Sequence, residues 1–516
     1  MTRLLCLLCL FSQLAMALPP GTPAPKNAAF SNNLLEDLSA AIEKALNAWD
    51  MDEARRLLVQ VEELNLHGLA LLHYVRGRMA FQLGLYEEAA DEFVLAGQDD
   101  KPNTFLRLAN AGKRFLKTAQ RFESEHFVLF VPKGKQAALS GYALEVLEAQ
   151  YAALKADAGL ASREKLRVEV VTSARELAEL SGVPLDKLLN SDRVALGVFG
   201  KMVFLSPSAL RGGFDWQERL AHEYVQVAVA KHTRNKAPPW VQKALAAYWE
   251  SRWKNPPPPP LPQAPWAALQ QHMRTSNTLL LEKFRDALGE GAPLQTAQLA
   301  FAEGFLVMEY LRNQHGPHVF TQLLEKLSHQ ADAQRAISEL SHMPWTKWKQ
   351  QFRSATLARR FPPGPKPPPP LGRDTSPALL RELRLARLYA DSQRYQAAAH
   401  HYAKAWALGG QTPPSVAQDY VQVLLSLSRF DEAERVLAAS LDENSAPATL
   451  WISLGKLRLQ QSQWAKAQAA FERALAQNPF FPELHLGLSS AAQAQGNTAL
   501  AKRAQEAAAV LLNGTP

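Results

Sequence analysis

A small residue recurs about every 34 positions through the C-terminal third of the chain. Ala398, Ala433, Ala467 and Ala501 are spaced by 35, 34 and 34 residues, each within a segment of helical composition. A fixed period of this length is typical of stacked two-helix units, which bury their apolar faces only against their neighbours. The sequence therefore predicts an all-α helical repeat array over residues 377–514.

The clearest unit of this array carries an ordered set of seven residues: Trp451, Leu454, Gly455, Ala467, Phe471, Ala474 and Pro479. In order and spacing they match the W, L, G, A, F, A and P of the tetratricopeptide repeat, which this part of the chain resembles. Gly455 and Ala467 are small enough for the two helices to cross closely, and Phe471 is expected to fill the gap between units. The last unit has Gln505 where an aromatic is usual, and a polar terminal unit suits the end of a solenoid.

A weaker version of the same pattern lies near the N-terminus. Ala54 is followed 35 residues later by Ala89, with Gly77 before it and Phe93 after it. We therefore expect a tetratricopeptide-like helical segment over residues 30–119, built from two degenerate units.

The first seventeen residues are typical of a secretory signal peptide. Arg3 precedes an apolar run from Leu4 to Leu14, and Ala15-Met16-Ala17 is a small-residue cleavage site. Both cysteines, Cys6 and Cys9, fall inside residues 1–17, so the mature chain would contain no disulfide. We expect an exported protein, periplasmic or secreted.

Charge and hydropathy argue against a nucleic-acid partner and against a membrane-spanning segment. Lys and Arg exceed Asp and Glu by 57 to 49 but form no basic stripe, which argues against a nucleic-acid partner. After the leader there is no apolar run of 18 residues, so no transmembrane segment is expected in the mature chain.

Proline marks the joints of the chain. Residues 359–376 form a proline-rich linker that contains FPPGPKPPPPL and is expected to hold the C-terminal array away from the preceding domain. A second proline-rich stretch at 255–262 is interpreted as a surface loop within the central domain.

The central region, residues 120–358, alternates between predicted strands and helices and indicates an α+β domain. Strands are predicted over 126–131 and 166–171, and Gly200-Lys201 is expected to turn a hairpin between 194–199 and 202–205. A helix begins after Asp215 and contains the run RLAHEYVQVAVAKH.

This order of elements resembles the gluzincin-type (thermolysin-like) metallopeptidases, and most of all the bacterial peptidase-MA-like family. In that family one helix carries two zinc-binding histidines four residues apart and a glutamate that activates water. A second helix, with a sequence close to PxWxxEGxAxY, supplies the third ligand. Pro239, Trp240 and Tyr248 fit that second helix. The resemblance implies a metallopeptidase-like domain flanked by tetratricopeptide-type repeats.

The ligand positions themselves are substituted. His222 and Glu223 stand at the first ligand and the general base, but Gln226 replaces the second histidine and Lys243 the ligand glutamate. An amide oxygen is a poor zinc donor and an ammonium repels a dication, so no cofactor is expected. Our hypothesis is that the Lys243 charge takes the place of the ion and faces Glu223, with His222 and Gln226 around it.

Other residues are poor substitutes for the missing ligands. Glu250 lies seven residues beyond Lys243, about 10 Å further along a helix, which we take to be too far. His232 is expected at a helix end, and His315 and His318 flank Gly316-Pro317, which favours a loop.

The sequence predicts an exported protein- or peptide-binding protein with an inactive metallopeptidase-like domain, that is, a pseudopeptidase. The partner would bind the concave face of the repeats or the retained cleft. Two alternatives stay open: an active zinc-dependent metallopeptidase with unusual ligands, and an envelope scaffold. Neither the partner's identity nor the oligomeric state follows from the sequence.

Overall fold

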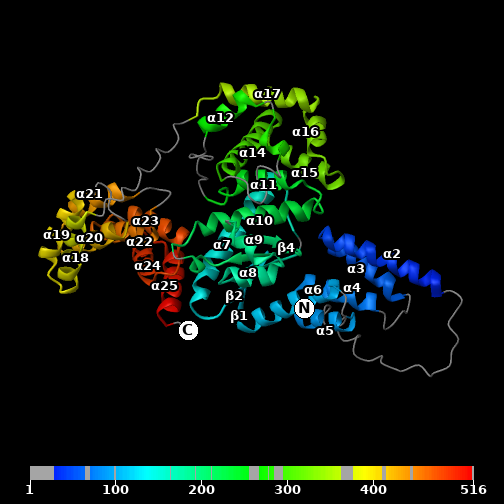
Figure 1. The fold of residues 1–516 in the computed structure, drawn as a ribbon, viewed down its shortest axis with the longest axis horizontal. Helices are drawn as coiled ribbons and strands as arrows, with labels where there is room; N and C mark the ends of the chain where they lie inside the picture. The colour runs from blue at the N-terminus through cyan, green and yellow to red at the C-terminus, as the bar shows by residue number, and fades with distance from the viewer. Residues whose placement is uncertain are drawn as a thin grey trace.

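A computed structural model describes most of the chain, and it is largely helical with one five-stranded sheet in the described part (Figure 1). The described residues are 28–63, 70–97, 100–162, 164–191, 193–210, 212–254, 266–276, 278–283, 294–361, 376–408, 414–441 and 446–513. The predicted signal peptide, residues 1–17, and all prolines of the two proline-rich stretches lie outside these ranges. Within them, no helix has the length and apolar character that a bilayer span requires.

The N-terminal segment is helical, as predicted. It contains α2 (Ala28–Asn47), α3 (Met51–Glu63), α4 (Ala70–Leu83), α5 (Tyr86–Leu95) and α6 (Asp100–Thr118). Gly77 of α4 faces Phe93 of α5 so closely that a Cβ on Gly77 would lie 2.7 Å from the ring. Ala54 and Ala89 are fully buried. The small residues of the repeat pattern are therefore where helices touch.

The central sheet has the strand order β1-β2-β3-β5-β4. Its strands are β1 (Ala119–Glu123), β2 (Phe127–Pro132), β3 (Leu166–Val171), β4 (Ala195–Val198) and β5 (Lys201–Leu205). The three inner strands are parallel, and β1 and β4 are antiparallel edge strands. The β4–β5 hairpin turns at Phe199-Gly200, one residue earlier than predicted, and both residues have positive φ as a two-residue hairpin turn requires.

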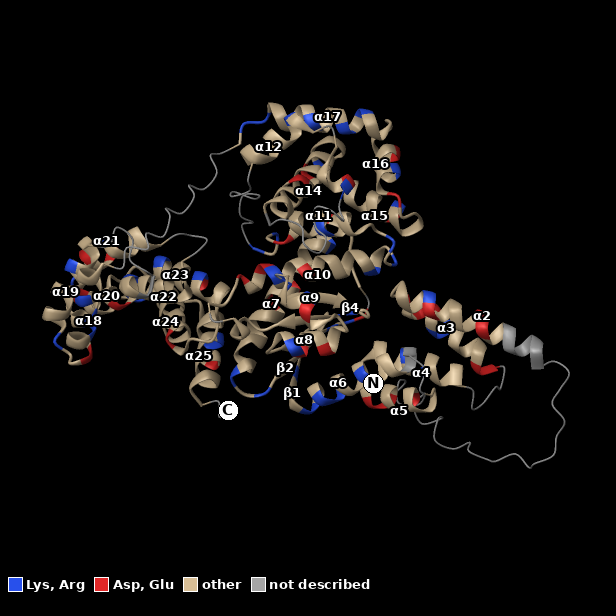
Figure 2. Ribbon diagram, viewed as in Figure 1, with Lys and Arg blue, Asp and Glu red and all other residues tan. Residues whose placement is uncertain are grey.

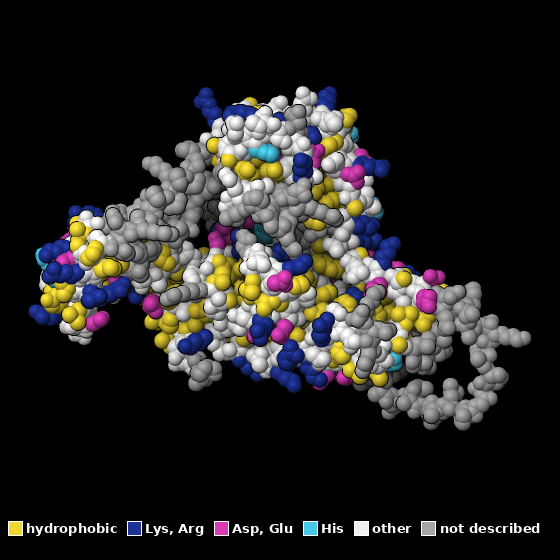
Figure 3. All heavy atoms as spheres, in the orientation of Figure 1, with side chains coloured by type: hydrophobic (Ala, Val, Ile, Leu, Met, Phe, Trp, Pro, Cys, Tyr) yellow, Lys and Arg dark blue, Asp and Glu magenta, His cyan; other side chains and the backbone are white. Residues whose placement is uncertain are grey.

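Helices surround this sheet and form a further helical layer. The elements are η1 (Gly134–Leu139), α7 (Ser140–Ala158), α8 (Ala174–Ser181), α9 (Leu185–Leu189), η2 (Pro207–Ala209), α10 (Trp216–His232), α11 (Pro239–Trp249), α12 (Trp266–Thr275), η3 (Leu280–Lys283), α14 (Leu294–His315), α15 (Val319–His329), α16 (Ala333–Ser341) and α17 (Trp345–Ala358). Helix α10 contacts β4 and β5 on one side and α11 on the other, and α11 in turn packs on α14. On the face drawn in Figure 3, the surface is hollowed between the helices around α12 and the part of the molecule below them.

The C-terminal array consists of four helix pairs: α18 (Pro377–Asp391) with α19 (Tyr395–Leu408), α20 (Pro414–Ser426) with α21 (Phe430–Ser440), α22 (Ala448–Gln460) with α23 (Trp464–Gln477), and α24 (Pro482–Ala494) with α25 (Thr498–Asn513). Helices α18, α20, α22 and α24 contact one another in succession, so they form the inner layer of the array. The Phe471 ring lies against glycines of two units, because a Cβ on Gly455 or Gly487 would approach it within 2.6 and 2.2 Å. The prediction that Phe471 fills the space between units is confirmed.

The expectation that the proline-rich linker separates this array from the central unit is wrong. The indole N–H of Trp216 in α10 donates to the Leu475 carbonyl at 2.7 Å, and the Phe214 amide donates to the Gln477 carbonyl at 3.0 Å. One continuous apolar core runs from the sheet into α22–α25, and Figure 1 draws α24 and α25 beside the central unit. The composition of the linker cannot predict this contact between the array and the central unit, because the contact is made by residues that precede and follow the linker in the chain.

The two ends of the array have different surroundings, and Gln505 of the last unit is exposed. Two positions on the first helix of each unit can be compared along the array, because they recur at the repeat period. One position is occupied by Arg381, Val416, Leu450 and Leu484, and the other by Leu388, Val423, Leu457 and Ala491. In the first unit they are exposed, and in later units they are buried. The first unit is therefore the solvated end, whereas α25 of the last unit packs on η1.

Candidate functional site

Helix α10 brings together the residues that the sequence singled out. The Glu223 carboxylate accepts hydrogen bonds through both oxygens: Oε1 from the Gly197 backbone N–H at 2.5 Å, and Oε2 from the Gln226 amide at 3.1 Å. Burial raises the pKa of Glu223, and this effect is opposed by the charge of His222, the Gly197 N–H and the charge of Lys243. The carboxylate is thus held by protein donors on β4 and on its own helix.

The imidazole of His222 is oriented by a residue that the sequence analysis set aside. Its Nδ1 lies 2.8 Å from Oε2 of Glu250, directly after the end of α11, and both side chains are largely buried. The expectation that Glu250 is too far away is wrong for His222. The distance was judged along α11 from Lys243, whereas the chain reverses between α10 and α11 and brings the end of α11 beside the start of α10.

Lys243 lies on the α11 face that looks toward this site. Its Nζ is 5.8 Å from the centre of the Phe301 ring, and that ring in turn is 6.4 Å from the His222 ring. The placement brings the ammonium within electrostatic range of Glu223. The idea that Lys243 stands in for a divalent ion stays a prediction.

The residues present do not fit a zinc ion. A catalytic zinc site takes three protein donors, typically histidine or carboxylate. Here His222 offers one ring nitrogen. Gln226 offers a side-chain amide that is hydrogen-bonded to Glu223, and Lys243 offers an ammonium cation. No group of three or more His, Cys, Asp or Glu side chains in the described ranges is arranged to hold a metal ion, and this includes His232, His315 and His318.

Trp49 is a site residue that the sequence analysis missed. It sits in the turn between α2 and α3, yet its ring packs against the central core. A Cβ built on Gly197 would lie 3.7 Å from Cη2 of Trp49 and 3.2 Å from Oε1 of Glu223. No local pattern marks Trp49, because only the tertiary fold brings the N-terminal helices to β4.

Strand β4 is the edge strand of the sheet at this site, and within the described ranges no further strand pairs with its outer side. The two-residue turn makes Val198 and Lys201 a hydrogen-bonded pair, and the Leu205 N–H donates to Val194 at the other end. The alternation of antiparallel pairing therefore turns the backbone groups of Ala195 and Gly197 outward. We call these outward groups the β4 edge. Its Gly197 N–H is the one taken by Glu223.

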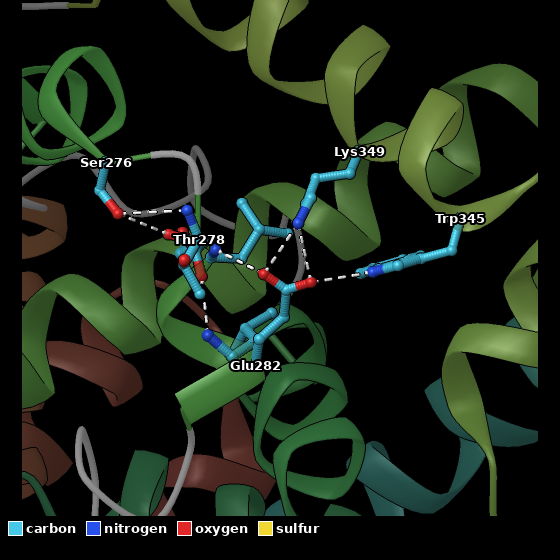
Figure 4. A network of polar contacts seen from close by, with 8 residues as sticks. Ser276, Thr278, Glu282, Trp345 and Lys349 are labelled. Atoms are coloured by element: carbon cyan, nitrogen blue, oxygen red, sulfur yellow. Dashed lines mark hydrogen bonds and ion pairs between the residues drawn. The ribbon is translucent and has the colours of Figure 1, made fainter.

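A second polar network lies in the outer helical layer, away from these residues (Figure 4). Glu282 accepts hydrogen bonds from the Leu279 amide, the Trp345 indole and the Lys349 ammonium at 2.9 to 3.0 Å. Nearby, Glu303 is fully buried and accepts from the Leu281 amide, and burial raises its pKa to about 8. These partners fix η3 against α14 and α17, so we assign the network a structural role.

In the ribbon of Figure 2, Lys and Arg positions and Asp and Glu positions are both distributed over the helices of the N-terminal segment, the central unit and the array.

Comparison with known proteins supports the repeats alone. No curated protein sequence matches the chain. Two solved structures, the yeast Tom70 and the Cut9–Hcn1 APC/C hetero-tetramer, cover 94% and 93% of the chain, which covers 85% and 94% of theirs. Their identities are 10% and 12% and their TM-scores 0.25 and 0.24, too low to carry an argument. Nothing in these comparisons supports a peptidase-MA-like domain. The tetratricopeptide repeat family model matches residues 452–513, so the C-terminal part of the chain carries tetratricopeptide repeats.

Proposed function

We propose that this chain is an exported peptide- or protein-binding protein whose central domain has a metallopeptidase-like frame but does not hydrolyse peptides. One observation carries the proposal. The Glu223 carboxylate, at the position of the general base, accepts hydrogen bonds from Gly197 and Gln226 through its two oxygens. A general base in a metallopeptidase acts on a water that a metal ion polarises. Here each oxygen of Glu223 is already engaged by one protein donor, and Gln226 and Lys243 at the ligand positions are poor partners for a zinc ion.

The frame itself supports the gluzincin-like part of the proposal. A mixed sheet ends in the antiparallel edge strand β4, α10 runs beside that edge, and α11 begins at Pro239-Trp240 and packs on α10. His222, Glu223, Gln226 and Lys243 lie in or beside one site, as the resemblance implies for the ligand positions. The donor set does not fit zinc, so we assign no reaction step to a metal.

Two surfaces carry groups that a partner could bind. On the inner layer of the array, Leu380 of α18 and Leu486 of α24 are each 50% exposed. The β4 edge offers backbone groups to which an extended peptide could add as a strand. Both surfaces suit an unstructured polypeptide, which combines apolar side chains with free backbone groups.

The test uses purified full-length protein and fluorescein-labelled β-casein, an unstructured protein. We expect casein to bind, measured as a rise in fluorescence anisotropy, and to stay intact on a gel for many hours. Replacing both inner leucines by Asp (L380D/L486D) should weaken this binding at least tenfold if the array is the receptor. The matched control L408D/L512D changes equally exposed leucines on the outer-layer helices α19 and α25 and should leave binding unchanged.

Chelator-sensitive cleavage of casein would overturn the proposal and restore the metallopeptidase alternative. Absence of casein binding in every variant would contradict the binding function and favour the scaffold alternative. One observation favours a scaffold: the array and the central unit share a continuous apolar core.

A further inference from the structure

The N-terminal helix pair lies beside the β4 edge. Figure 1 draws α2 and α3 next to β4, and the turn between them, residues 47–50, reaches the end of α10. The Asn235 amide donates to the Asn47 carbonyl at 3.3 Å, and Asp50 pairs with Arg234 at 3.3 Å. We propose that this turn is an internal cover of the β4 edge, which an extended peptide has to displace. The inference rests on the proposed binding function.

Trp49 is the covering side chain. Its ring and the Glu223 carboxylate both lie within 4 Å of the point where a Gly197 Cβ would be. Val227 of α10 lies closer still to that point, at 2.5 Å, so the tip of the ring meets β4 on the face that α10 covers. A strand paired with β4 would lie about 4.8 Å outside it, on the side where α2 and α3 are drawn in Figure 1, so the helix pair and the strand compete for this place.

The backbone of this turn suits a glycine. Trp49 has φ +59, in the left-handed region that glycine adopts without strain. The turns of the other helix pairs have the same conformation at Gly84, Gln393, Ser428, Ser462 and Gly496. The positive φ therefore belongs to the turn of the two-helix unit, and the ring of Trp49 is the part that is particular to this turn.

The polar contacts that hold the turn are weak enough to open. The Arg234 side chain is 61% exposed, and exposed ion pairs contribute about 0–1 kcal/mol. The donor of the β4 edge is also blocked from within, because the Gly197 N–H is engaged by Glu223. An incoming carbonyl can accept from Gly197 only after this bond breaks.

The experiment compares Trp49→Gly with the wild-type full chain. Glycine suits the left-handed turn, so the variant removes the ring without straining the backbone. Trp464→Ala is the control, because Trp464 is a surface tryptophan of α23, 37% exposed. The probe is labelled β-casein in the anisotropy assay, with hydrogen exchange of the Ala195 and Gly197 amides as a second measurement that needs no ligand.

We expect Trp49→Gly to tighten casein binding about fivefold or more, because apparent affinity scales with the fraction of molecules whose site is open. The β4 amides should exchange faster in the variant without casein and more slowly once casein is added. Trp464→Ala should match the wild type within twofold.

Other outcomes have separate meanings. Unchanged binding overturns the cover, and weakened binding means that Trp49 is part of the binding surface. If casein binding is lost only in L380D/L486D and its affinity is the same in Trp49→Gly as in the wild type, the binding function holds and the cover is wrong. If no protein binds casein, the proposed function fails, and the cover fails with it when β4 exchange is equal in the variant and the wild type.

Discussion

The carboxylate of Glu250 lies 2.8 Å from Nδ1 of His222, from the far end of the neighbouring helix. This bond fixes the orientation of the imidazole and leaves Nε2 for another partner. Carboxylates that orient a histidine in this way strengthen its binding of metals. The substituted site therefore retains one well-oriented nitrogen donor.

Restoring the two missing ligands should create a zinc site. In Gln226→His/Lys243→Glu, the helix places the new imidazole four residues from His222, and the ammonium gives way to a carboxylate. We expect one zinc per chain by elemental analysis. Adding Glu250→Gln should weaken zinc affinity about 10- to 100-fold through loss of the orienting bond. A double variant that binds no metal would contradict the gluzincin-like geometry.

Removing the Lys201 charge should strongly destabilise the contact between the N-terminal helices and the sheet. Lys201 Nζ lies 2.5 Å from both Glu169 and the Tyr86 hydroxyl, all buried. Burial alone would raise the pKa of Glu169, but the charges of Lys201 and Arg167 lower it to about 2. Lys201→Met leaves the carboxylate undercompensated and should cost about 3–5 kcal/mol in urea unfolding. Lys201→Met/Glu169→Gln should recover part of this loss, and equal losses in both would argue against the charge explanation.

Glu303 should make stability depend on pH. Its pKa of about 8 exceeds the ordinary value of 4.5, so between these values the folded state keeps a proton that the unfolded state releases. Stability contributed by this group therefore falls as pH rises through this window, by up to about 1.4 kcal/mol per pH unit. Glu303→Gln should lack this dependence, so its free energy of unfolding should rise relative to that of the wild type from pH 5 to pH 8. Glu88→Gln, at an exposed position of α5, is the control, and parallel profiles for Glu303→Gln and the wild type would refute the prediction.

Adding a methyl group at Gly487 should destabilise the array. A Cβ there would lie 2.2 Å from the Phe471 ring, so the ring or a helix has to shift, at a cost of about 1–3 kcal/mol. Gly141→Ala is a matched change in α7, where the new Cβ would meet only the Arg503 side chain at 3.7 Å. Stability there should hold or rise slightly, because alanine favours the helix. Equal melting temperatures for Gly487→Ala and the wild type would show that the ring packs elsewhere.

Cutting the chain between the central unit and the array should not separate them. A protease site inserted within residues 362–375 should yield two fragments that elute together in size-exclusion chromatography, because the interface is apolar and includes the Trp216–Leu475 hydrogen bond. Separation of the fragments after cleavage at low salt would contradict the interface. The interface also contains the ion pair between Glu145 and Arg503. Each single change, Glu145→Arg or Arg503→Glu, should weaken the association of the fragments, and the double variant should restore it.

The periodic pattern of the sequence was sufficient to predict the helical repeats, because small residues at a 34-residue spacing report the contacts within each unit. Gly77 against Phe93 and Gly455 against Phe471 are the same contact at both ends of the chain. The alternating hydrophobicity of 166–171 likewise predicted β3. The HExxQ run predicted which residues of α10 share a face, because helical period alone decides that.

Contacts between distant segments could not be predicted. Glu250 meets His222 because α11 reverses along α10, Trp49 meets Gly197 because the N-terminal helices dock on β4, and Leu475 meets Trp216 across the proline-rich linker. Local propensity depends on neighbours within a few residues, whereas these pairs are set by how whole elements pack and which buried polar groups find partners. The sequence by itself therefore determined the repeat units and the residues that share a face of α10, and the tertiary structure alone decided what surrounds Glu223.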